Sequence, residues 1–256
     1  MTMPPEAPLL EAKNLSLRFG RIAALDDVSI QVWPGEVLAV VGESGSGKTT
    51  LLRVLHGDLA PDAGQVLYAG RDVHAMPAPD RKWLARNAWG FVHQNPRDGL
   101  RMAVSAGGNI GERLMAAGAR HWGNIRAAAI EWLNRVEIPP DRIDDPPRKF
   151  SGGMQQRLQI ARVLVMGPKI VFMDEPTGGL DVSVQARLLD LIRRLTHELG
   201  LASVIVTHDL AVARLLADRT VVMSQGRVVE QGLTDQVLDD PHHAYTQLLV
   251  SSVLQA

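Results

Sequence analysis

The sequence contains no cysteine, and this absence excludes several kinds of site at once. A chain without thiols forms no disulfide, no thiolate zinc site and no cysteine-ligated iron–sulfur cluster. An excess of one charge is also missing, because 27 basic and 28 acidic residues leave a formal net charge of −1. This balance argues against a dedicated binder of nucleic acid or anionic membranes, so we expect no nucleic-acid partner.

Long apolar runs are lacking as well. No stretch approaches the roughly 20 apolar residues that a membrane-spanning helix requires, so we expect no direct membrane insertion. The first fourteen residues, MTMPPEAPLLEAKN, have no basic segment followed by an apolar run, unlike a signal peptide. The 256 residues, 46% of them apolar, suffice for one large domain, and we expect a cytoplasmic location.

Short apolar segments alternate with helical patterns along most of the chain, which predicts βαβ units and an α/β fold. From about 103 to 165 the apolar residues fall at helical spacing and no strand pattern appears. We therefore expect a single domain over 1–256 with a helical subdomain inserted at about 103–165. Strand-like segments are predicted at 9–19, 28–33, 37–41, 65–69, 88–92, 170–173, 203–206 and 220–223.

One glycine-rich segment fits the phosphate-loop pattern G-x-x-x-x-G-K-[ST] between a predicted strand and a predicted helix. The glycines let the loop wrap its N–H groups around a β-phosphate, Lys48 supplies a cation, and the Thr49 hydroxyl is a Mg²⁺ ligand. A glycine-rich turn before a helix is the structural alternative, and the flanking elements disfavour it. The loop comprises Gly42, Glu43, Ser44, Gly45, Ser46, Gly47, Lys48 and Thr49.

Polar residues follow three further predicted strands. In IVFMDEP the apolar strand ends on Asp174, which suits the Mg²⁺-side acid of a nucleoside triphosphatase, and on Glu175, which can polarise the attacking water. Gln94 in FVHQNP is placed to bridge Mg²⁺ and that water, and His208 in IVTHD suits a γ-phosphate sensor. Taken alone, a loop glutamine is more often solvated and a lone histidine more often structural.

A second glycine motif, FSGGMQQR at 150–157, opens a predicted helix. The first turn of a helix presents unpaired N–H groups and the positive end of the dipole, so the motif suits a phosphate. Ser151 as an ordinary helix cap explains it equally well, because the same cap geometry makes the anion site.

These motifs, in this order, resemble the nucleotide-binding domain of ATP-binding cassette (ABC) proteins over essentially the whole chain. The resemblance implies a P-loop NTPase fold with a RecA-like core, an antiparallel β subdomain and an α-helical insert, and hydrolysis of ATP with Mg²⁺. It identifies Walker A at 42–49, the Q-loop at Gln94, the signature motif at 151–155, Walker B at 170–175, the D-loop at 178–181 and the switch histidine at His208.

The resemblance also implies roles for residues that chemistry alone does not single out. Phe19 is expected to stack on adenine, and Thr50 to extend the Walker A contacts. Ser151, Gly152 and Gly153 are expected to serve the γ-phosphate of ATP held by a second subunit, as is Asp181 of the D-loop. The D-loop reads GGLD in place of the common SALD, and the extra glycine loosens the backbone, which weakens the assignment of Asp181.

Two branches of the superfamily are similar to this chain. The tail DDPHHAYTQLLVSSV resembles the dipeptide, oligopeptide and nickel importer ATPases. Segments 104–126, 175–195 and 216–255 resemble the ABC-type ATPases of the carbon–phosphorus lyase system for phosphonate breakdown. That resemblance implies an ATP-hydrolysing subunit that docks, as an ATP-sandwiched homodimer or a heterodimer with a related ABC ATPase, on the carbon–phosphorus lyase core subunits.

Two alternatives stay open, an importer ATPase and a nucleotide-dependent scaffold with little turnover; Glu175 and His208 argue against the scaffold. A candidate docking segment is NPRDGLRMAV at 95–104, where charged residues lie beside apolar ones. Its composition does not separate a protein contact from a solvated loop, and the resemblance favours the contact. Its charged residues are Arg97, Asp98 and Arg101, and its apolar residues are Leu100, Met102 and Val104.

Overall fold

The computed structural model describes residues 7–253, which fall into two compact units. Among the described residues, the first unit comprises 7–82 and 193–253, and the second comprises 83–192. Two helices cross the boundaries, α2 (Ala78–Asn87) and α7 (Val182–Leu199). No helix in the described part of the chain is long and apolar enough to span a membrane.

The first unit contains an antiparallel sheet whose strands lie in the order β2-β1-β4-β5. Alternate side chains of the central strand are buried because one face of the sheet packs against the core and the other meets solvent. Tight turns join β1 to β2 and β4 to β5. The strands are β1 (Leu10–Phe19), β2 (Ile22–Val32), β4 (Ala63–Tyr68) and β5 (Arg71–Asp72).

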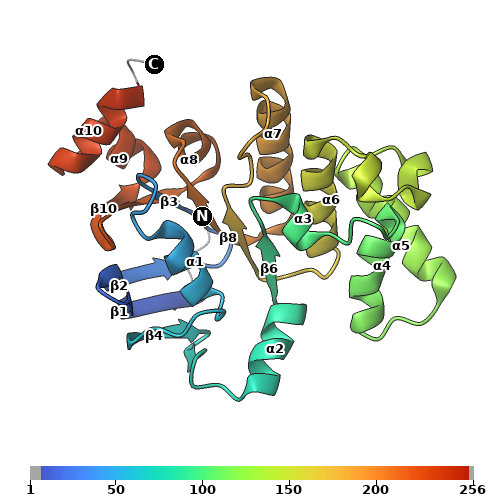
Figure 1. Cartoon of the computed structure of the whole chain (residues 1–256), viewed down its shortest axis with the longest axis horizontal. Helices are drawn as coiled ribbons and strands as arrows, with labels where there is room; N and C mark the ends of the chain where they lie inside the picture. The colour runs from blue at the N-terminus through green and yellow to red at the C-terminus, as the bar shows by residue number, and fades with distance from the viewer. Residues whose placement is uncertain (1–6, 254–256) are drawn as a thin grey trace. The chain divides into compact units, whose positions relative to one another are not determined.

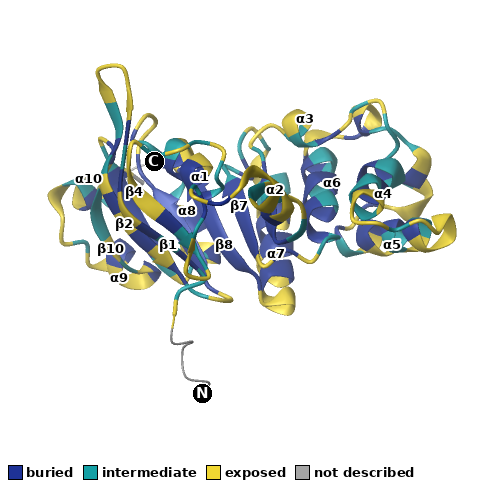
Figure 2. Cartoon of the chain, turned by 90° about the horizontal axis from the view of Figure 1, so that it is seen from below, coloured by how far each residue is buried: buried dark blue, intermediate teal, exposed yellow. Residues whose placement is uncertain are grey.

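The same unit also contains a mainly parallel arrangement around β3 (Val37–Val41), shown in Figure 1. All five residues of β3 are buried, as expected for an apolar strand with covered faces. The strand beside it, β8, is likewise buried along its length (Figure 2). Strands β8 (Ala202–Thr207) and β9 (Arg219–Ser224) flank β3 in parallel, and β10 (Arg227–Leu233) pairs antiparallel with β9. The helices of this unit are α1 (Lys48–Leu55), α8 (Leu210–Leu216), α9 (Thr234–Asp239) and α10 (Ala244–Val253).

An apolar cluster joins β3 to the C-terminal helices. Side chains of β3 and β9 pack with side chains of α8 and α9, and Tyr245, Leu249 and Val250 of α10 cover this group. The C-terminal helix is therefore part of the core that supports β3. The buried members are Ala39, Val41, Leu210, Ala213, Val222, Val237 and Leu238.

The second unit contains the parallel pair β6 (Trp89–Val92) and β7 (Ile170–Asp174). Its described residues between 103 and 165 form helices and turns and no strand, as the apolar spacing predicts. Pro140 and Pro147 stand at the first positions of two short 3₁₀ helices, Pro140–Asp144 and Pro147–Lys149, where a missing N–H costs nothing. The α-helices are α3 (Pro96–Gly99), α4 (Ala106–Ala116), α5 (Trp122–Arg135) and α6 (Gly152–Leu164).

The expected α/β alternation, antiparallel β subdomain and helical insert are confirmed, and the differences lie in exposed or short elements. Strand β10 has no buried residue, so its sequence RVVEQGL lacks the alternation that would reveal it. Helix α9 has six residues, too few to establish a period. Strand β2 begins six residues before the predicted strand at 28–33 because its first part pairs with the end of β1.

Candidate nucleotide-binding site

The phosphate loop follows β3 and leads into α1. Gly47 is the residue before α1 and has a φ of 104°, a conformation that favours glycine. The buried Lys48 side chain turns back over the loop, and its Nζ donates to the Gly42 and Glu43 carbonyl oxygens at 2.7 Å each. The loop thus holds its cation in place through its own backbone.

Two glycines of the loop lie against backbone of the same unit. A Cβ on Gly42 (φ +148°) would lie 2.2 Å from the carbonyl oxygen of Met223, and a Cβ on Gly47 would lie 2.4 Å from that of Ala24. A Cβ on Gly45 (φ +83°) would meet no atom within 4 Å. Gly42 and Gly47 therefore allow close backbone packing, whereas Gly45 borders open space.

His208 follows the strand next to the one that precedes the loop. Val41 and Thr207, the last residues of β3 and β8, are in register, so Gly42 and His208 lie side by side just beyond the carboxyl ends of these parallel strands. The His208 side chain is exposed. Asp209, which follows it, caps α8 by accepting from the Ala211 N–H at 2.8 Å. The first unit therefore brings the phosphate loop and His208 to adjacent strand ends, the position where open α/β sheets bind ligands.

The second unit brings Gln94 close to the acids Asp174 and Glu175, again because they lie at or just beyond the ends of neighbouring parallel strands. Val92 and Met173 are in register, so the chain leaves β6 and β7 side by side. The Gln94 Nε2 donates to Glu175 Oε2 at 3.1 Å. Glu175 has a φ of +41°, unusual for a residue with a side chain, and it is half-buried like Asp174. Gly178 donates its N–H to the Glu175 carbonyl at 2.9 Å, which closes the turn.

The signature motif has the helix-cap geometry that its sequence predicts. Ser151 precedes α6, and its Oγ accepts from the Met154 N–H at 3.3 Å. Gly152 is exposed, but Gly153 is buried, and a Cβ on it would lie 2.4 Å from Val184 Cγ1. A side chain at position 153 would therefore meet Val184 of α7 in the same chain. Gly152 is the open position.

Two further residues assigned by resemblance are accessible. Phe19 ends β1 and is 52% exposed. Asp181 is exposed before α7, and its carbonyl accepts from the Gln185 N–H at 2.8 Å.

The segment 95–104 divides into exposed and buried parts. Arg97 and Asp98 are exposed, but Leu100 is only 6% exposed, so the expectation that Leu100 serves an outside contact is wrong. Arg101 Nη2 pairs with Glu112 Oε1 at 2.8 Å, and Arg162 Nη2 lies 3.7 Å from Glu112 Oε2.

The surroundings of Glu112 carry an excess of positive charge. Burial lowers the pKa of the Arg162 guanidinium, and the Glu112 carboxylate counteracts this only in part. Burial also lowers the pKa of Arg113, and the nearby charge of Arg162 lowers it further. Several arginines therefore share one carboxylate here.

The residues assigned to Mg²⁺ have suitable chemistry. A hydroxyl (Thr49), an amide oxygen (Gln94) and a carboxylate (Asp174) are the hard oxygen ligands that Mg²⁺ prefers, and Mg²⁺ takes few protein ligands beside substrate phosphates. Within residues 7–253 no group of three or more His, Cys, Asp or Glu side chains is arranged to hold a metal by itself.

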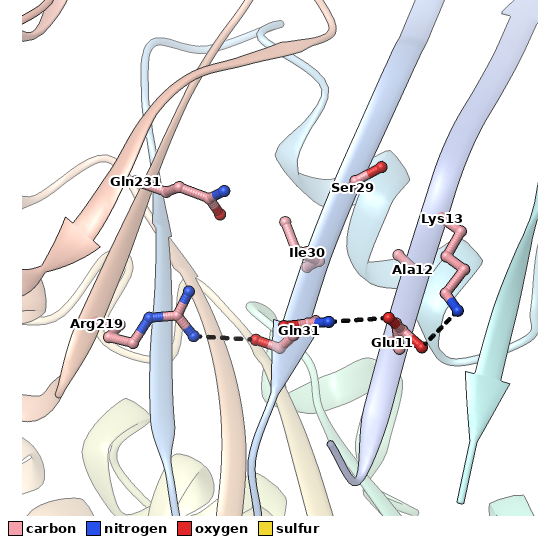
Figure 3. Close-up of a pocket in the computed structure, with 8 residues that line it drawn as sticks. All are labelled: Glu11, Ala12, Lys13, Ser29, Ile30, Gln31, Arg219 and Gln231. Carbon is pink, nitrogen blue, oxygen red and sulfur yellow. Dashed lines mark hydrogen bonds and ion pairs between the residues drawn. The ribbon is translucent and has the colours of Figure 1, made fainter. Parts of the chain in front are cut away.

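A cavity of about 190 Å³ lies elsewhere in the first unit (Figure 3). Its charged groups are already engaged, because Glu11 pairs with Lys13 at 3.0 Å and Arg219 with Glu36 at 3.0 Å. The Gln31 side chain also donates to Glu11 at 2.9 Å. No residue of the phosphate loop lines it; the lining residues are Glu11, Ala12, Lys13, Ser29, Ile30, Gln31, Arg219 and Gln231.

Comparison with known proteins identifies the class. The profile of the family described as ABC transporter matches residues 25–178, more than half of the chain. The chain therefore belongs to this family, and it is an ABC-type ATPase that binds ATP.

Among individual relatives, one from Escherichia coli (strain K12) is named as a phosphonates utilization ATP-binding protein, PhnK. It is 68% identical over 248 residues, covering 97% of this chain and 98% of the relative. A relative from Brucella abortus (strain 2308), named as a peptide import ATP-binding protein, is 39% identical and covers 96% of this chain and 77% of its own. The expected resemblance to the phosphonate branch is confirmed.

Solved structures agree with the fold. A dimeric structure of the ATP-binding cassette MJ0796, bound to ADP and Pi in a post-hydrolysis state, has a TM-score of 0.79 at 30% identity and covers 88% of this chain and 98% of its own. The cbiO1 protein from Clostridium perfringens, part of the transporter complex cbiONQ, has a TM-score of 0.82 at 30% identity, with 92% of each chain covered.

The structure adds one residue to the phosphate loop that the sequence motifs do not include. The Glu43 N–H donates to the Tyr245 hydroxyl oxygen at 3.1 Å. The two residues are 202 positions apart, so no local pattern links them. The only sequence signal is that Tyr245 lies in the tail segment resembling other ABC ATPases.

Proposed function

We propose that this chain is the cytoplasmic ATP-hydrolysing subunit of the carbon–phosphorus lyase complex in phosphonate catabolism, working as an ATP-sandwiched dimer docked on the lyase core. The observation that carries the proposal is 68% identity, over nearly the whole of both chains, to a relative named for phosphonates utilization. The chain has no cysteine to hold an iron–sulfur cluster, so we assign it the ATPase step and not the lyase chemistry.

In the proposed hydrolysis the loop N–H groups and Lys48 hold the β- and γ-phosphates and neutralise their charge. Thr49, Gln94 and Asp174 would hold Mg²⁺, which offsets the charge on the phosphates when bound. Glu175 orients the attacking water and accepts its proton.

The hydrogen bond from Gln94 to Glu175 supports the assignment of Glu175, because it holds the carboxylate toward the residue expected at the metal. His208 donates to the γ-phosphate from the adjacent strand end, and Phe19 stacks on the adenine ring.

The exposed Ser151 cap supports the proposed dimer. The first N–H groups of α6 have no partner within the helix, and a Cβ on the exposed Gly152 would meet the Leu180 side chain at 3.5 Å, an ordinary contact distance. We assign this turn and Asp181 to ATP held by the partner subunit. The partner is a second copy of this chain or a related ABC ATPase, and the similar cassette MJ0796 forms dimers in its solved structures.

For the docking surface we propose the exposed part of segment 95–104 together with the neighbouring arginines. Arg97 is exposed, and the arginines near Glu112 outnumber the carboxylates, so the surface suits an acidic partner segment.

The test is purification from cells that also make the lyase subunits. The protein should be recovered from the cytosolic fraction together with lyase subunits, and no detergent should be needed. Arg97→Glu should break this association and leave ATP hydrolysis by the isolated chain unchanged, because Arg97 lies outside the nucleotide motifs. Arg120→Glu, a charge reversal on the exposed turn after α4, is the matched control and should copurify as wild type. Arg101→Glu is less informative because it also breaks the ion pair with Glu112.

An importer ATPase is the second candidate, favoured by the relative named for peptide import at 39% identity. It predicts recovery in the membrane fraction with a permease. That result would contradict the lyase proposal while leaving the ATPase assignment intact. A third candidate, a scaffold with little turnover, predicts ATP binding without steady release of phosphate, which a phosphate-release assay measures directly.

A further inference from the structure

One peptide unit of the phosphate loop is hydrogen-bonded on both sides by side chains. The carbonyl of the Gly42–Glu43 peptide accepts from Lys48 Nζ at 2.7 Å. The N–H of the same peptide donates to the Tyr245 hydroxyl oxygen at 3.1 Å. In a trans peptide the C=O and N–H point in opposite directions, so the two bonds hold one rigid plane from its two edges.

The orientation of the Gly42–Glu43 peptide depends on its hydrogen-bond partners because the residue before it is a glycine. Gly42 has a φ of +148°, in a region that residues with side chains rarely adopt. Without a Cβ its dihedral angles are only weakly restricted by its own sterics, so the orientation of the next peptide depends on its partners. Lys48 is one partner, but its ammonium group must also serve the phosphates of the nucleotide.

Tyr245 is held independently of the loop. Its ring packs on the apolar cluster that contains Ala39 and Val41 of β3. Just before Tyr245 in the sequence, the backbone N–H groups of His242 and His243 donate to the Glu230 carboxylate at 2.8 and 3.0 Å. Figure 1 shows α10, which carries the tyrosine, beside α9 and β10. The hydroxyl is therefore a fixed acceptor, and the loop amide is the part that it orders.

We infer that Tyr245 is a positioning residue of the nucleotide site: its hydroxyl fixes the Gly42–Glu43 peptide plane and so keeps a carbonyl acceptor of Lys48 in place before ATP arrives. The inference rests on the proposed role of the phosphate loop. A loop ordered in advance loses less conformational freedom when it binds, so the tyrosine contributes to affinity for ATP more than to the chemical step.

Tyr245→Phe tests the inference because it keeps the packed ring and removes only the acceptor. One net hydrogen bond corresponds to a change of about three- to tenfold. We expect the Kd and KM for ATP to rise by about that factor, with kcat and the thermal melting midpoint close to wild type. Tyr68→Phe, the same change at the other of the chain's two tyrosines, should leave the affinity for ATP unchanged.

A second readout observes the bond itself. In amide NMR spectra of the nucleotide-free full chain, the Glu43 proton should move upfield in Tyr245→Phe and exchange faster with solvent. An unchanged Glu43 amide together with unchanged affinity overturns the inference, as does a parallel fall of kcat and melting midpoint at constant KM. A wild-type chain that binds no ATP would instead overturn the assignment of the phosphate loop.

Discussion

Replacing Glu175 by glutamine removes a base and almost nothing else. The two side chains have the same shape, and the carbonyl oxygen of the new amide can still accept from Gln94 Nε2, which lies 3.1 Å from Glu175 Oε2 in the wild type. The positive φ of 41° at this position belongs to the backbone turn and is unchanged by the substitution. The substitution therefore removes the carboxylate that accepts the proton from water, because an amide is not a base at neutral pH.

General base catalysis is worth about 10²- to 10⁴-fold, or roughly 3–5 kcal/mol of transition-state stabilisation. Phosphate release per ATP site by Glu175→Gln should fall by that factor, while the Kd for ATP stays within about twofold of wild type. The ATP-bound dimer should accumulate and be visible by light scattering. Glu131→Gln, the same change on the exposed surface of α5, is the control and should hydrolyse ATP at the wild-type rate. Hydrolysis by Glu175→Gln at that rate would refute the assignment of the base.

Four other substitutions test the separate parts of the site. Lys48→Ala should weaken ATP binding at least tenfold in equilibrium titrations, because Lys48 provides the loop's cation; wild-type affinity would contradict that role. Gly152→Asp should abolish ATP-driven dimerisation in light scattering and spare the affinity of the monomer, whereas an equal loss of monomer affinity would mean that the motif serves its own subunit. Gly45→Ala should cost about 1–2 kcal/mol of stability in thermal melts, from backbone strain alone. Gly42→Ala should cost clearly more because its Cβ would meet the Met223 carbonyl at 2.2 Å, and equal costs would argue against that close packing.

The parts of the site that the sequence predicts are those set by local chain geometry. A phosphate loop is a strand, a turn and a helix in succession, so its pattern is readable within a dozen residues. Gln94 and Glu175 are each predicted from the local pattern at a strand end, but their proximity depends on the pairing of β6 with β7, which only the structure shows.

The parts that the sequence does not predict depend on packing between distant segments. Whether Gly152 or Gly153 is open depends on how α6 rotates against α7, and no motif specifies that rotation. The local sequence predicts that Leu100 is an exposed apolar residue, but packing with other segments buries it. Tyr245 has no local signal at all, because its partner lies 202 residues earlier.

The arrangement of the first unit has a consequence for the order in which the protein is made. Its two pieces come from the beginning and the end of the chain, and β3 pairs with β8 and β9, which are translated long after it. A nascent chain that has reached residue 201 therefore carries the complete Walker A sequence, yet both edges of β3 still lack their strands, and Met223 and Tyr245 do not yet exist. Such long-range pairing is slow, and unpaired strand edges favour aggregation while they wait. We therefore expect ribosome-bound chains to bind ATP only after the last helix has emerged. ATP binding would then distinguish complete chains from incomplete ones.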